Sequence, residues 1–327
     1  MKNFAYLCAD SLDQARQAAA QPDAMLLAGG TTLLDLAKCG ITAPETVIDI
    51  MRLVGLDAIT FDQHGVSIGA LAKMSRVADD AGIREYFPAV SESLSQAASA
   101  QLRNMATIGG NLMQRTRCPY FRDPAAFPAC NKRAPGSGCA AIGGVTRNHA
   151  VLGTSPSCIA TYPGDLAVAL VAFDAEIDLG TRRIAVDNLF LLPGTTPQRE
   201  HAIEPGEMIT AIHIPASAAA RRSTYLKVRD RQSYEFAAAS AAVGLALAPD
   251  GRTVTDIRVA LGGVATKPWR ARSVEDALKG KTLTAETVER AARSAVEGAI
   301  AQGANRYKID LAPRVVARAI LKVGGLA

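Results

Sequence analysis

Four cysteines fall within residues 118–158, in a stretch composed mostly of Pro, Gly, Ser and basic residues. They are Cys118, Cys130, Cys139 and Cys158. A segment this poor in apolar residues is not expected to bury enough surface to fold around a core of its own. Something else must therefore order residues 112–158, called the cysteine segment below. Four thiolates around one metal centre would do so, and iron–sulfur clusters are held by four Cys ligands.

Three alternatives to a cluster remain open from the cysteine pattern alone. Two disulfides would need an oxidising compartment, and chains that depend on them are usually short. Structural zinc usually draws on paired C-x2-4-C knuckles, whereas the gaps here are eleven, eight and eighteen residues. Cysteines that merely pack usually lie in apolar strands or helices. Cys8 and Cys39 lie outside the segment and are interpreted as ordinary, partly buried thiols.

The net charge of +5 can be traced to the cysteine segment. Between residues 112 and 150 a single acid, Asp123, faces six basic residues, a difference of five: Arg115, Arg117, Arg122, Lys132, Arg133 and Arg147. Such a patch is compatible with nucleic-acid binding. However, aromatic residues make up only 5% of the chain, which disfavours base-stacking platforms. Cations beside a negatively charged cluster are the better interpretation, and no nucleic-acid partner is expected.

Composition predicts a soluble globular protein of two or three domains, with 327 residues, 49% of them apolar and 20% charged. No apolar run reaches the roughly 18 residues that a membrane-spanning helix needs. Residues 1–9 carry one Lys and lack the apolar core of a signal peptide. Unaided, the chain is expected to stay in the cytoplasm.

The first fifty residues predict a compact βαβ unit. Ser11 and Gln14 match a capping box that opens a helix to about Ala20. Strands are expected over residues 25–28 and 46–50, with a helix over residues 33–38 between them.

Farther along the chain, the pattern predicts mixed helices and strands. Helices are expected over residues 76–86, 90–98 and 166–173, and strands over 66–68, 176–179, 224–228, 237–247 and 253–261, with a linker at 216–222. Thr284 is predicted to cap a helix that runs to about Gln302. The final helix is predicted to start at Pro313, because Pro is favoured in the first turn.

Two Gly-Gly turns, Gly29-Gly30 and Gly109-Gly110, are flanked by small or hydroxyl residues. Glycine lets the backbone approach a ligand closely, and successive exposed N–H groups can bind an anion. Neither turn matches G-x-G-x-x-G or a P-loop, so a Rossmann dinucleotide fingerprint and a P-loop are both absent.

The two turns together resemble the FAD-pyrophosphate loops of the flavoprotein subunits of molybdenum hydroxylases. The resemblance rests on residues 27–33 (LAGGTTL) and 101–111 (QLRNMATIGGN), on YPGDLA at 162–167, YLKVR at 225–229, and LGGV at 261–264 followed by Lys267-Pro268. Gly164 replaces the Ser that is usual in the family's Pro-Ser-Asp-Leu motif.

The resemblance implies an α+β fold. A two-subdomain FAD-binding module of the PCMH, or vanillyl-alcohol-oxidase-like, type would be followed by a small α+β domain of the CO dehydrogenase flavoprotein C-terminal type. The corresponding domains are residues 1–55, the βαβ subdomain; residues 56–217, the second FAD-binding subdomain with an iron–sulfur insertion at about 112–154; and residues 218–327.

This insertion resembles the one in the medium subunit of bacterial periplasmic aldehyde oxidoreductase, which carries FAD and a [4Fe-4S] cluster. A related insertion occurs in the β subunit of 4-hydroxybenzoyl-CoA reductase. The run around Cys118, Cys130 and Cys139 is more similar to the former.

Carried over residue by residue, the resemblance implies a set of cofactor-binding residues. The first turn would bind pyrophosphate through its backbone N–H groups, Thr107 and Asn111 would donate to flavin or phosphate oxygens, Asp165 would accept from a ribose hydroxyl, and Lys227 would place a positive charge near the flavin. The predicted FAD contacts are Met25, Leu26, Leu27, Ala28, Gly29, Gly30, Thr31, Thr32, Leu33, Thr107, Gly110, Asn111, Asp165, Ile209 and Lys227. The predicted cluster ligands are Cys118, Cys130, Cys139 and Cys158.

No protein nucleophile or catalytic residue is expected, because the flavin carries the chemistry. The four histidines lie scattered without metal-ligand spacing, and His149 is interpreted as a loop histidine.

As the family implies, the chain would receive electrons from a large molybdopterin-binding subunit through a small subunit with two [2Fe-2S] clusters. From FAD they would pass to an external acceptor. A small subunit with a twin-arginine signal could carry the chain to the periplasm. The alternatives are an acyl-CoA reductase subunit with inward electron flow, a flavin-free electron-transfer protein, and an assembly scaffold with a four-cysteine zinc site.

Overall fold

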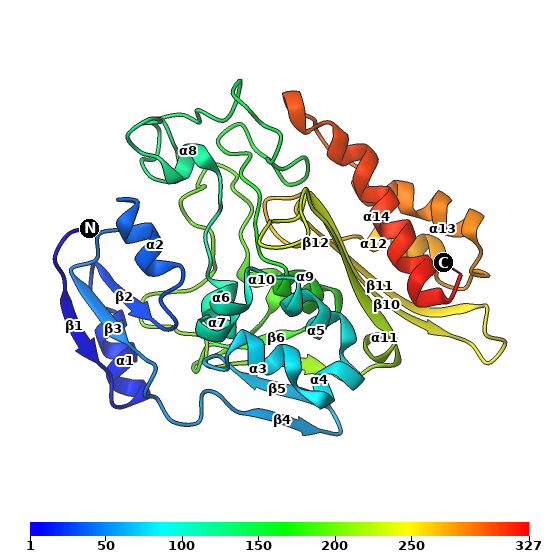
Figure 1. Cartoon of the computed structure of the whole chain (residues 1–327), viewed down its shortest axis with the longest axis horizontal. Coiled ribbons are helices and arrows are strands. Elements are labelled where there is room, and N and C mark those ends of the chain that lie inside the picture. Colours follow the sequence, from blue (N-terminus) through cyan, green and yellow to red (C-terminus); the bar gives the residue numbers. More distant parts are fainter. Residues whose placement is uncertain (327) are drawn as a thin grey trace.

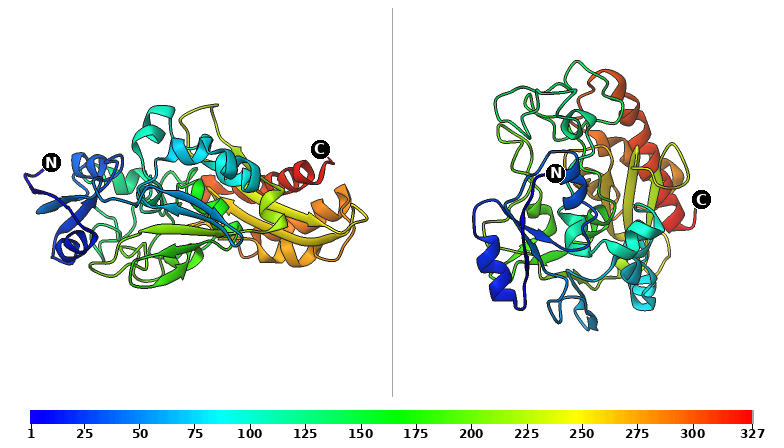
Figure 2. Two further views of the ribbon diagram at one scale, coloured as in Figure 1. Left: turned by 90° about the horizontal axis from the view of Figure 1, so that it is seen from below. Right: turned by 60° about the vertical axis from the view of Figure 1, so that its left-hand side comes forward.

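The computed structural model describes residues 1–326, which form three β-sheets with helices packed around them (Figure 1). The N-terminal sheet lies at one end of the molecule and the C-terminal sheet, with its long helix, at the other (Figure 2). None of the helices in residues 1–326 is both long and apolar enough to cross a membrane.

The first sheet is parallel, with strand order β1-β3-β2. Its strands are β1 (Ala5–Cys8), β2 (Ala24–Leu27) and β3 (Thr46–Asp49), connected by α1 (Leu12–Ala19) and α2 (Leu33–Lys38). The predicted helices and strands are confirmed, and β1 adds a strand that the sequence pattern did not reveal. Ser11 caps α1 by accepting from the N–H of Gln14. The Gln14 side chain accepts from the N–H of Asp10 rather than from that of Ser11, so only half of the capping box forms.

The second sheet has five strands in the order β4-β5-β8-β6-β7, with every pair antiparallel. The strands are β4 (Ile59–Asp62), β5 (Gly65–Gly69), β6 (Glu176–Asp178), β7 (Arg183–Ala185) and β8 (Ala211–Pro215). The helices of this part of the chain are α3 (Met74–Asp79), α4 (Ala81–Tyr86), α5 (Pro88–Ser95), α6 (Ala100–Met105), α7 (Ile108–Leu112), α8 (Pro119–Arg122), α9 (Leu166–Ala172) and α10 (Val186–Leu189).

The third sheet is antiparallel, with strand order β12-β11-β10-β9. Its strands are β9 (Ser223–Val228), β10 (Ala239–Leu247), β11 (Val254–Gly262) and β12 (Trp269–Arg270). The helices around it are α11 (Ala218–Arg221), α12 (Arg272–Leu278), α13 (Ala285–Ala292) and α14 (Tyr307–Gly324), with 3-10 turns η1 (Arg293–Val296) and η2 (Gly303–Asn305). The predicted linker at 216–222 therefore contains a short helix.

Small residues let the third sheet pack closely on both faces. Alternate positions of β10 point to opposite faces, so Ala241 and Val243 join the core beneath α14, whereas Ala242 joins the core that contains α9. All residues of α9 are buried. A Cβ at Gly244 would approach the backbone of Ala219, so a larger residue at this position would push α11 off the sheet.

Four helix predictions were wrong in extent. The helix predicted over 90–98 corresponds to α5, which begins at Pro88 and ends at Ser95. The helix predicted over 76–86 breaks at Asp80, whose extended backbone and carboxylate cap α4 through the N–H of Ile83. Helix α13 ends at Ala292 rather than near Gln302, because η1 follows it and the chain then turns at Gly298 with a φ of +75°. Helix α14 begins at Tyr307 and contains Pro313 in its interior. Its buried face on β10 compensates for the backbone hydrogen bond that Pro cannot make.

The cysteine segment lies between α2 and the C-terminal helices, at the top of Figure 1. Between Leu112 and Leu166 this fully described stretch contains α8 and no strand. Contrary to expectation, it forms small apolar clusters. One joins Phe121 and Cys130 to Leu36 of α2, and another joins Tyr120 to Ile159. The segment is therefore anchored partly by apolar contacts that its composition did not predict.

Candidate functional site

A cleft of about 470 Å³ opens between the first and second sheets. Eleven of the residues predicted to contact FAD line it: Met25, Leu26, Ala28, Gly29, Gly30, Thr31, Thr32, Leu33, Thr107, Gly110 and Ile209. Segments that are far apart in the sequence thus meet around one cavity.

The first glycine turn presents unpaired backbone donors to this cleft. Gly30 has a φ of +74°, a conformation that glycine adopts without strain. Carbonyls of the turn already accept bonds from α2, since Leu34 N–H donates to Gly30 O at 3.2 Å. In the described chain, the N–H groups of residues 29–33 donate to no backbone or side-chain acceptor. Successive free N–H groups at a helix start favour an anion such as pyrophosphate.

The second glycine turn lies beside the first. A Cβ at Gly29 would overlap the carbonyl oxygen of Met105, just before Thr107. Thr107 is buried and caps α7 by accepting from the N–H of Gly110 at 3.3 Å. A Cβ at Gly110 would meet only the Thr107 hydroxyl oxygen within 4 Å, so the space beside the Gly110 Cα is otherwise open. The two turns therefore form one continuous backbone wall.

Four predicted FAD contacts do not line this cleft. Leu27 lies in β2, with its side chain near Gly30. The Asn111 amide lies 3.5 Å from the Met74 sulfur, and its Oδ1 is buried without a hydrogen-bond partner among residues 1–326.

The other two, Asp165 and Lys227, form a buried ion pair. Lys227 Nζ lies 2.8 Å from Asp165 Oδ2, with side-chain exposures of 1% and 6%. The Tyr225 hydroxyl donates to the other carboxylate oxygen at 2.6 Å. Burial raises the pKa of Asp165, and Lys227 opposes that shift. In this arrangement the two charges satisfy each other, and their predicted contacts with the flavin stay predictions.

On one wall of the cleft, the sequence predicted only Ile209 and missed its neighbours. The loop between α10 and β8 supplies His201, Ile203 and the stretch from Glu204 to Met208, and the cysteine segment supplies Arg115. Burial lowers the pKa of His201 to about 4, and its Nε2 has no hydrogen-bond partner among the residues that the structure describes. Besides Ile209, the sequence signal for this wall was the loop dipeptide Pro205-Gly206.

All four clustered cysteines line a single small cavity, together with Tyr120. Cys130 and Cys158 are buried, whereas Cys118 and Cys139 are partly exposed. A β-bridge joins residues 130 and 139, and a second bridge joins 155 and 158. The structure therefore brings together the four thiols that the sequence predicted to act as one set.

Each of the six cysteines in the chain is a free thiol. Burial raises the pKa of Cys118 to about 12 and also raises that of Cys158, where Lys132 opposes the shift. Cys118 Sγ lies 3.2 Å from His149 Nε2. Among the described residues, no group of three or more His, Cys, Asp or Glu side chains is placed to hold a metal ion.

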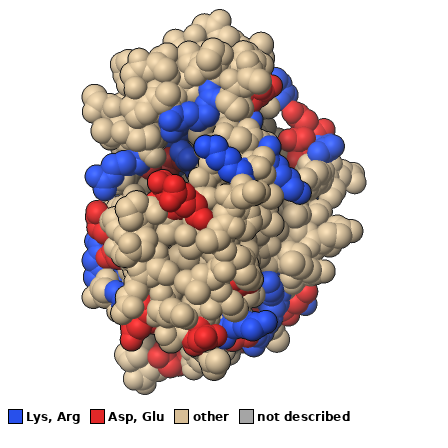
Figure 3. Space-filling model, turned by 90° about the vertical axis from the view of Figure 1, so that its left-hand side faces the viewer, with Lys and Arg blue, Asp and Glu red and all other residues tan. Residues whose placement is uncertain are grey.

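The basic residues of the cysteine segment are engaged within the chain. Arg117 and Arg122 both pair with Asp35 of α2. Arg133 donates to the carbonyl oxygens of Phe127 and Pro128. On the face shown in Figure 3, side chains of both charges lie next to one another beneath the cysteine segment rather than forming an uninterrupted basic surface.

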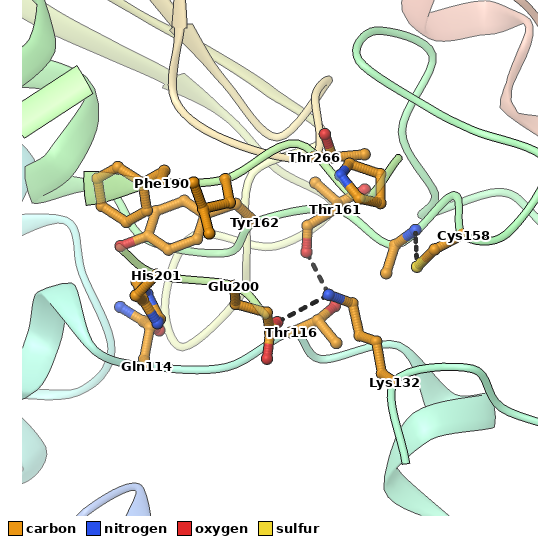
Figure 4. A pocket seen from close by; sticks show the side chains of 13 residues that line it. Gln114, Thr116, Lys132, Cys158, Thr161, Tyr162, Phe190, Glu200, His201 and Thr266 are labelled. Carbon is orange, nitrogen blue, oxygen red and sulfur yellow. Dashed lines mark hydrogen bonds and ion pairs between the residues drawn. The ribbon is translucent and has the colours of Figure 1, made fainter. Parts of the chain in front are cut away.

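Two further basic residues meet one carboxylate between the cysteine cavity and the cleft. Lys132 Nζ lies 3.0 Å from Glu200 Oε1 (Figure 4). Arg115 pairs with Oε2 of the same carboxylate. Burial alone would raise the pKa of Glu200, but Lys132 and Arg115 lower it below its usual range. The carboxylate therefore stays charged between two cations. Arg147 forms the remaining pair, an exposed one with Asp230.

The family comparison agrees with this geometry. The model of the FAD binding domain in molybdopterin dehydrogenase matches residues 2–217, and that of the CO dehydrogenase flavoprotein C-terminal domain matches residues 224–323. The chain belongs to the FAD-binding medium subunits of the molybdenum hydroxylases. It is accordingly a subunit of an oxidoreductase, and its mixed helix-and-sheet fold is the one that the resemblance implied.

Several members of this family are similar along nearly their whole length. The aldehyde oxidoreductase FAD-binding subunit PaoB of Escherichia coli is 42% identical over 325 residues, covering 97% of each chain. The carbon monoxide dehydrogenase medium chain of Hydrogenophaga pseudoflava is 28% identical, covering 91% of this chain and 88% of the relative. A solved structure of carbon monoxide dehydrogenase from Hydrogenophaga pseudoflava superposes with a TM-score of 0.77 at 25% identity, covering 100% of this chain and 99% of the other.

Proposed function

We propose that this subunit binds one FAD non-covalently in the cleft between its first two sheets and uses it to pass electrons out of an aldehyde-oxidising molybdenum enzyme. The observation that carries the proposal is the row of unpaired N–H groups at residues 29–33, which faces the Thr107–Gly110 turn across one cavity. The similarity to PaoB, a subunit of an aldehyde oxidoreductase, supports the substrate class.

The residues of the cleft fit the parts of FAD. The free N–H groups would hold the pyrophosphate, and apolar side chains such as Met25, Ile203 and Ile209 would cover less polar parts of the cofactor. When bound, the flavin supplies the electron-transfer chemistry. Neither glycine turn carries a His or Cys, so a covalent link is not expected there.

The cysteine cavity is proposed to hold a [4Fe-4S] cluster. Four sulfur donors line one cavity, and the charge of a bound metal would stabilise their thiolates against the effect of burial. A cubane binds one thiolate at each of its four irons, so its ligands need not converge on a single ion.

The partners in this proposal are a large molybdopterin-binding subunit and a small subunit with two [2Fe-2S] clusters, in a heterotrimer. The relatives support an assembly because their names describe subunits and medium chains. Co-export with a small subunit that carries a twin-arginine signal would place the complex in the periplasm. Finding the chain in the periplasm of cells that lack both partners would refute that route.

The proposed function is tested on the purified complex under anaerobic conditions. Adding an aldehyde should bleach the flavin absorbance, and an oxidant should restore it. Acid precipitation should release all of the flavin into the supernatant. A flavin that aldehyde leaves oxidised while reduced ferredoxin reduces it would contradict outward flow and favour the acyl-CoA reductase alternative.

A further inference from the structure

The cysteine segment is tied to three separate parts of the molecule through its basic residues. The carboxylates that they meet are Asp35 on α2 beside the first sheet, Glu200 in the α10–β8 loop of the second, and Asp230 in the β9–β10 loop of the third. Two of these three attachment points adjoin the cleft proposed for FAD.

One attachment holds the wall that carries the first glycine turn. Asp35 lies on α2, whose residues Leu33 and Leu36 line the cleft. Arg122, with a side chain only 13% exposed, pairs with Asp35 from the cysteine segment. Leu36 also packs in one apolar cluster with Phe121 and Cys130. Both an ion pair and apolar packing therefore attach α2 to the cysteine segment.

The other attachment holds the opposite wall. Glu200 immediately precedes His201, which lines the cleft. Arg115 pairs with Glu200, lines the cleft itself, and lies 4.6 Å from the centroid of the Phe121 ring. The exposed fractions of the Arg115 and Glu200 side chains are 22% and 16%, so solvent screens this pair only partly.

We propose that the cysteine segment fastens both walls of the FAD cleft, and that Asp35 and Glu200 are positioning residues for FAD through this segment. The proposal rests on the proposed function, since it takes the cleft to be the FAD site. Neither carboxylate needs to touch the flavin. Each carboxylate restrains one wall of the cleft before FAD binds. The free-energy cost of ordering that wall on binding is therefore smaller.

Asp230 provides a matched control in the same chain. Its pair with Arg147 attaches the same segment through the same kind of contact. Both side chains are about half exposed, at 58% and 48%, and neither residue lines the FAD cleft. Exposed pairs of this kind contribute little.

The experiment compares Asp35→Asn, Glu200→Gln and Asp230→Asn with wild type in the purified, anaerobic complex. Each protein is reversibly deflavinated and titrated with FAD by flavin fluorescence, well below its unfolding temperature. The Kd for FAD should rise about tenfold for Glu200→Gln and about threefold for Asp35→Asn, and it should stay within about twofold for Asp230→Asn. Iron content should remain at the wild-type level in all three.

Two further variants separate positioning from a general loss of stability. Arg122→Gln should weaken FAD binding by no more than Asp35→Asn does, because Arg117 also pairs with Asp35. The double variant should weaken binding by less than the sum of the two single effects, because both variants remove the Asp35–Arg122 pair. Asp35→Glu should restore most of the affinity.

The proposal is overturned if Asp35→Asn, Glu200→Gln and Arg122→Gln all bind FAD as wild type does. Equal weakening in Asp230→Asn would also overturn it, by showing a non-specific effect. A wild-type complex that binds no FAD would instead refute the proposed function.

Discussion

The FAD cleft and the cysteine segment are stabilised in different ways. The cleft depends on backbone: two glycine turns that line it, a φ of +74° at Gly30, and N–H groups at residues 29–33 that have no acceptor among the described residues. The cysteine segment between α7 and α9 contains one short helix, and side chains fasten it through ion pairs and two small apolar clusters. A site made of backbone groups is specified by local sequence. A segment held by its side chains depends on partner side chains that distant parts of the fold supply.

The largest expected effect is a loss of FAD in Gly30→Val. A β-branched side chain disfavours the positive φ of Gly30 and would press on Leu34 of α2, displacing the unpaired N–H groups. Flavin content after gel filtration should fall below about a tenth of wild type, with iron content retained, and absorbance and metal analysis measure both.

Gly40→Val is the control for backbone strain alone. Gly40 has a φ of +72°, and a Cβ there would meet nothing within 4 Å. It should cost stability but keep the flavin. Stoichiometric FAD in Gly30→Val would show that the cofactor does not depend on this turn.

Cys139→Ser tests the cysteine segment instead of the cleft. It should eliminate most or all of the proposed cluster, because a hydroxyl oxygen is a poorer ligand for iron than a thiolate. Without its metal the cysteine segment should be cut by protease at or near Pro135–Gly138, which lies in an exposed stretch. Iron analysis and limited proteolysis measure the two effects.

Cys39→Ser is the control, because Cys39 lies outside the cavity. It should keep its iron. A Cys139→Ser protein with wild-type iron and protease resistance would refute the role of Cys139 as a ligand.

Lys227→Met should lower the free energy of unfolding by about 3–5 kcal/mol, because it leaves the Asp165 carboxylate buried without its cation. Chemical denaturation measures the loss. Lys322→Met is the matched control, since Lys322 pairs with Glu92 while about half exposed, and it should change stability by less than about 1 kcal/mol.

The same variant decides the predicted flavin contact of Lys227. If Lys227 contacts the flavin, the folded variant should also bind FAD more weakly. Unchanged affinity in the folded variant would leave Lys227 with a purely structural role.

The smallest predicted effect concerns His201 and pH. Its pKa is about 4 in the folded chain, against 6.5 ordinarily, because burial disfavours the charged imidazole. The unfolded chain therefore binds this proton between pH 6.5 and pH 4 while the folded chain does not, so stability falls as the pH drops through that window.

His201→Gln should remove about 1–3 kcal/mol of this acid destabilisation in deflavinated protein. Denaturation curves at pH 7 and at pH 5 measure it. A variant whose stability falls as steeply as that of the wild type would contradict the assignment to His201.

The parts of the fold that depend on local pattern were predictable from sequence. The strand–helix alternation predicted around Leu33 was correct. Both glycine turns line the same cleft. The extent of α14 was not predictable, because Pro313 normally marks a helix start and only packing on β10 permits it inside. On the α10–β8 wall, Ile209 was predicted but His201 was missed, because His201 is placed there by the tertiary fold and not by a local motif.

The charges of the cysteine segment show the same limit. Sequence located the six basic residues, but it could not pair Arg122 with Asp35 or Lys132 with Glu200, which are 87 and 68 positions away. Such pairings follow from how distant segments meet in the folded chain. Residues that resemble a basic patch in the sequence therefore form ion pairs that attach the cysteine segment to the rest of the molecule.

The most direct test of the account is the cofactor content of the complex purified anaerobically. We expect about one FAD, four irons and four acid-labile sulfides for each copy of this chain, beyond the iron and sulfide that the two [2Fe-2S] clusters of the small subunit contribute. Stoichiometric zinc without the additional labile sulfide would contradict the cluster and favour a zinc scaffold, and a complex without flavin would contradict the function proposed for the cleft.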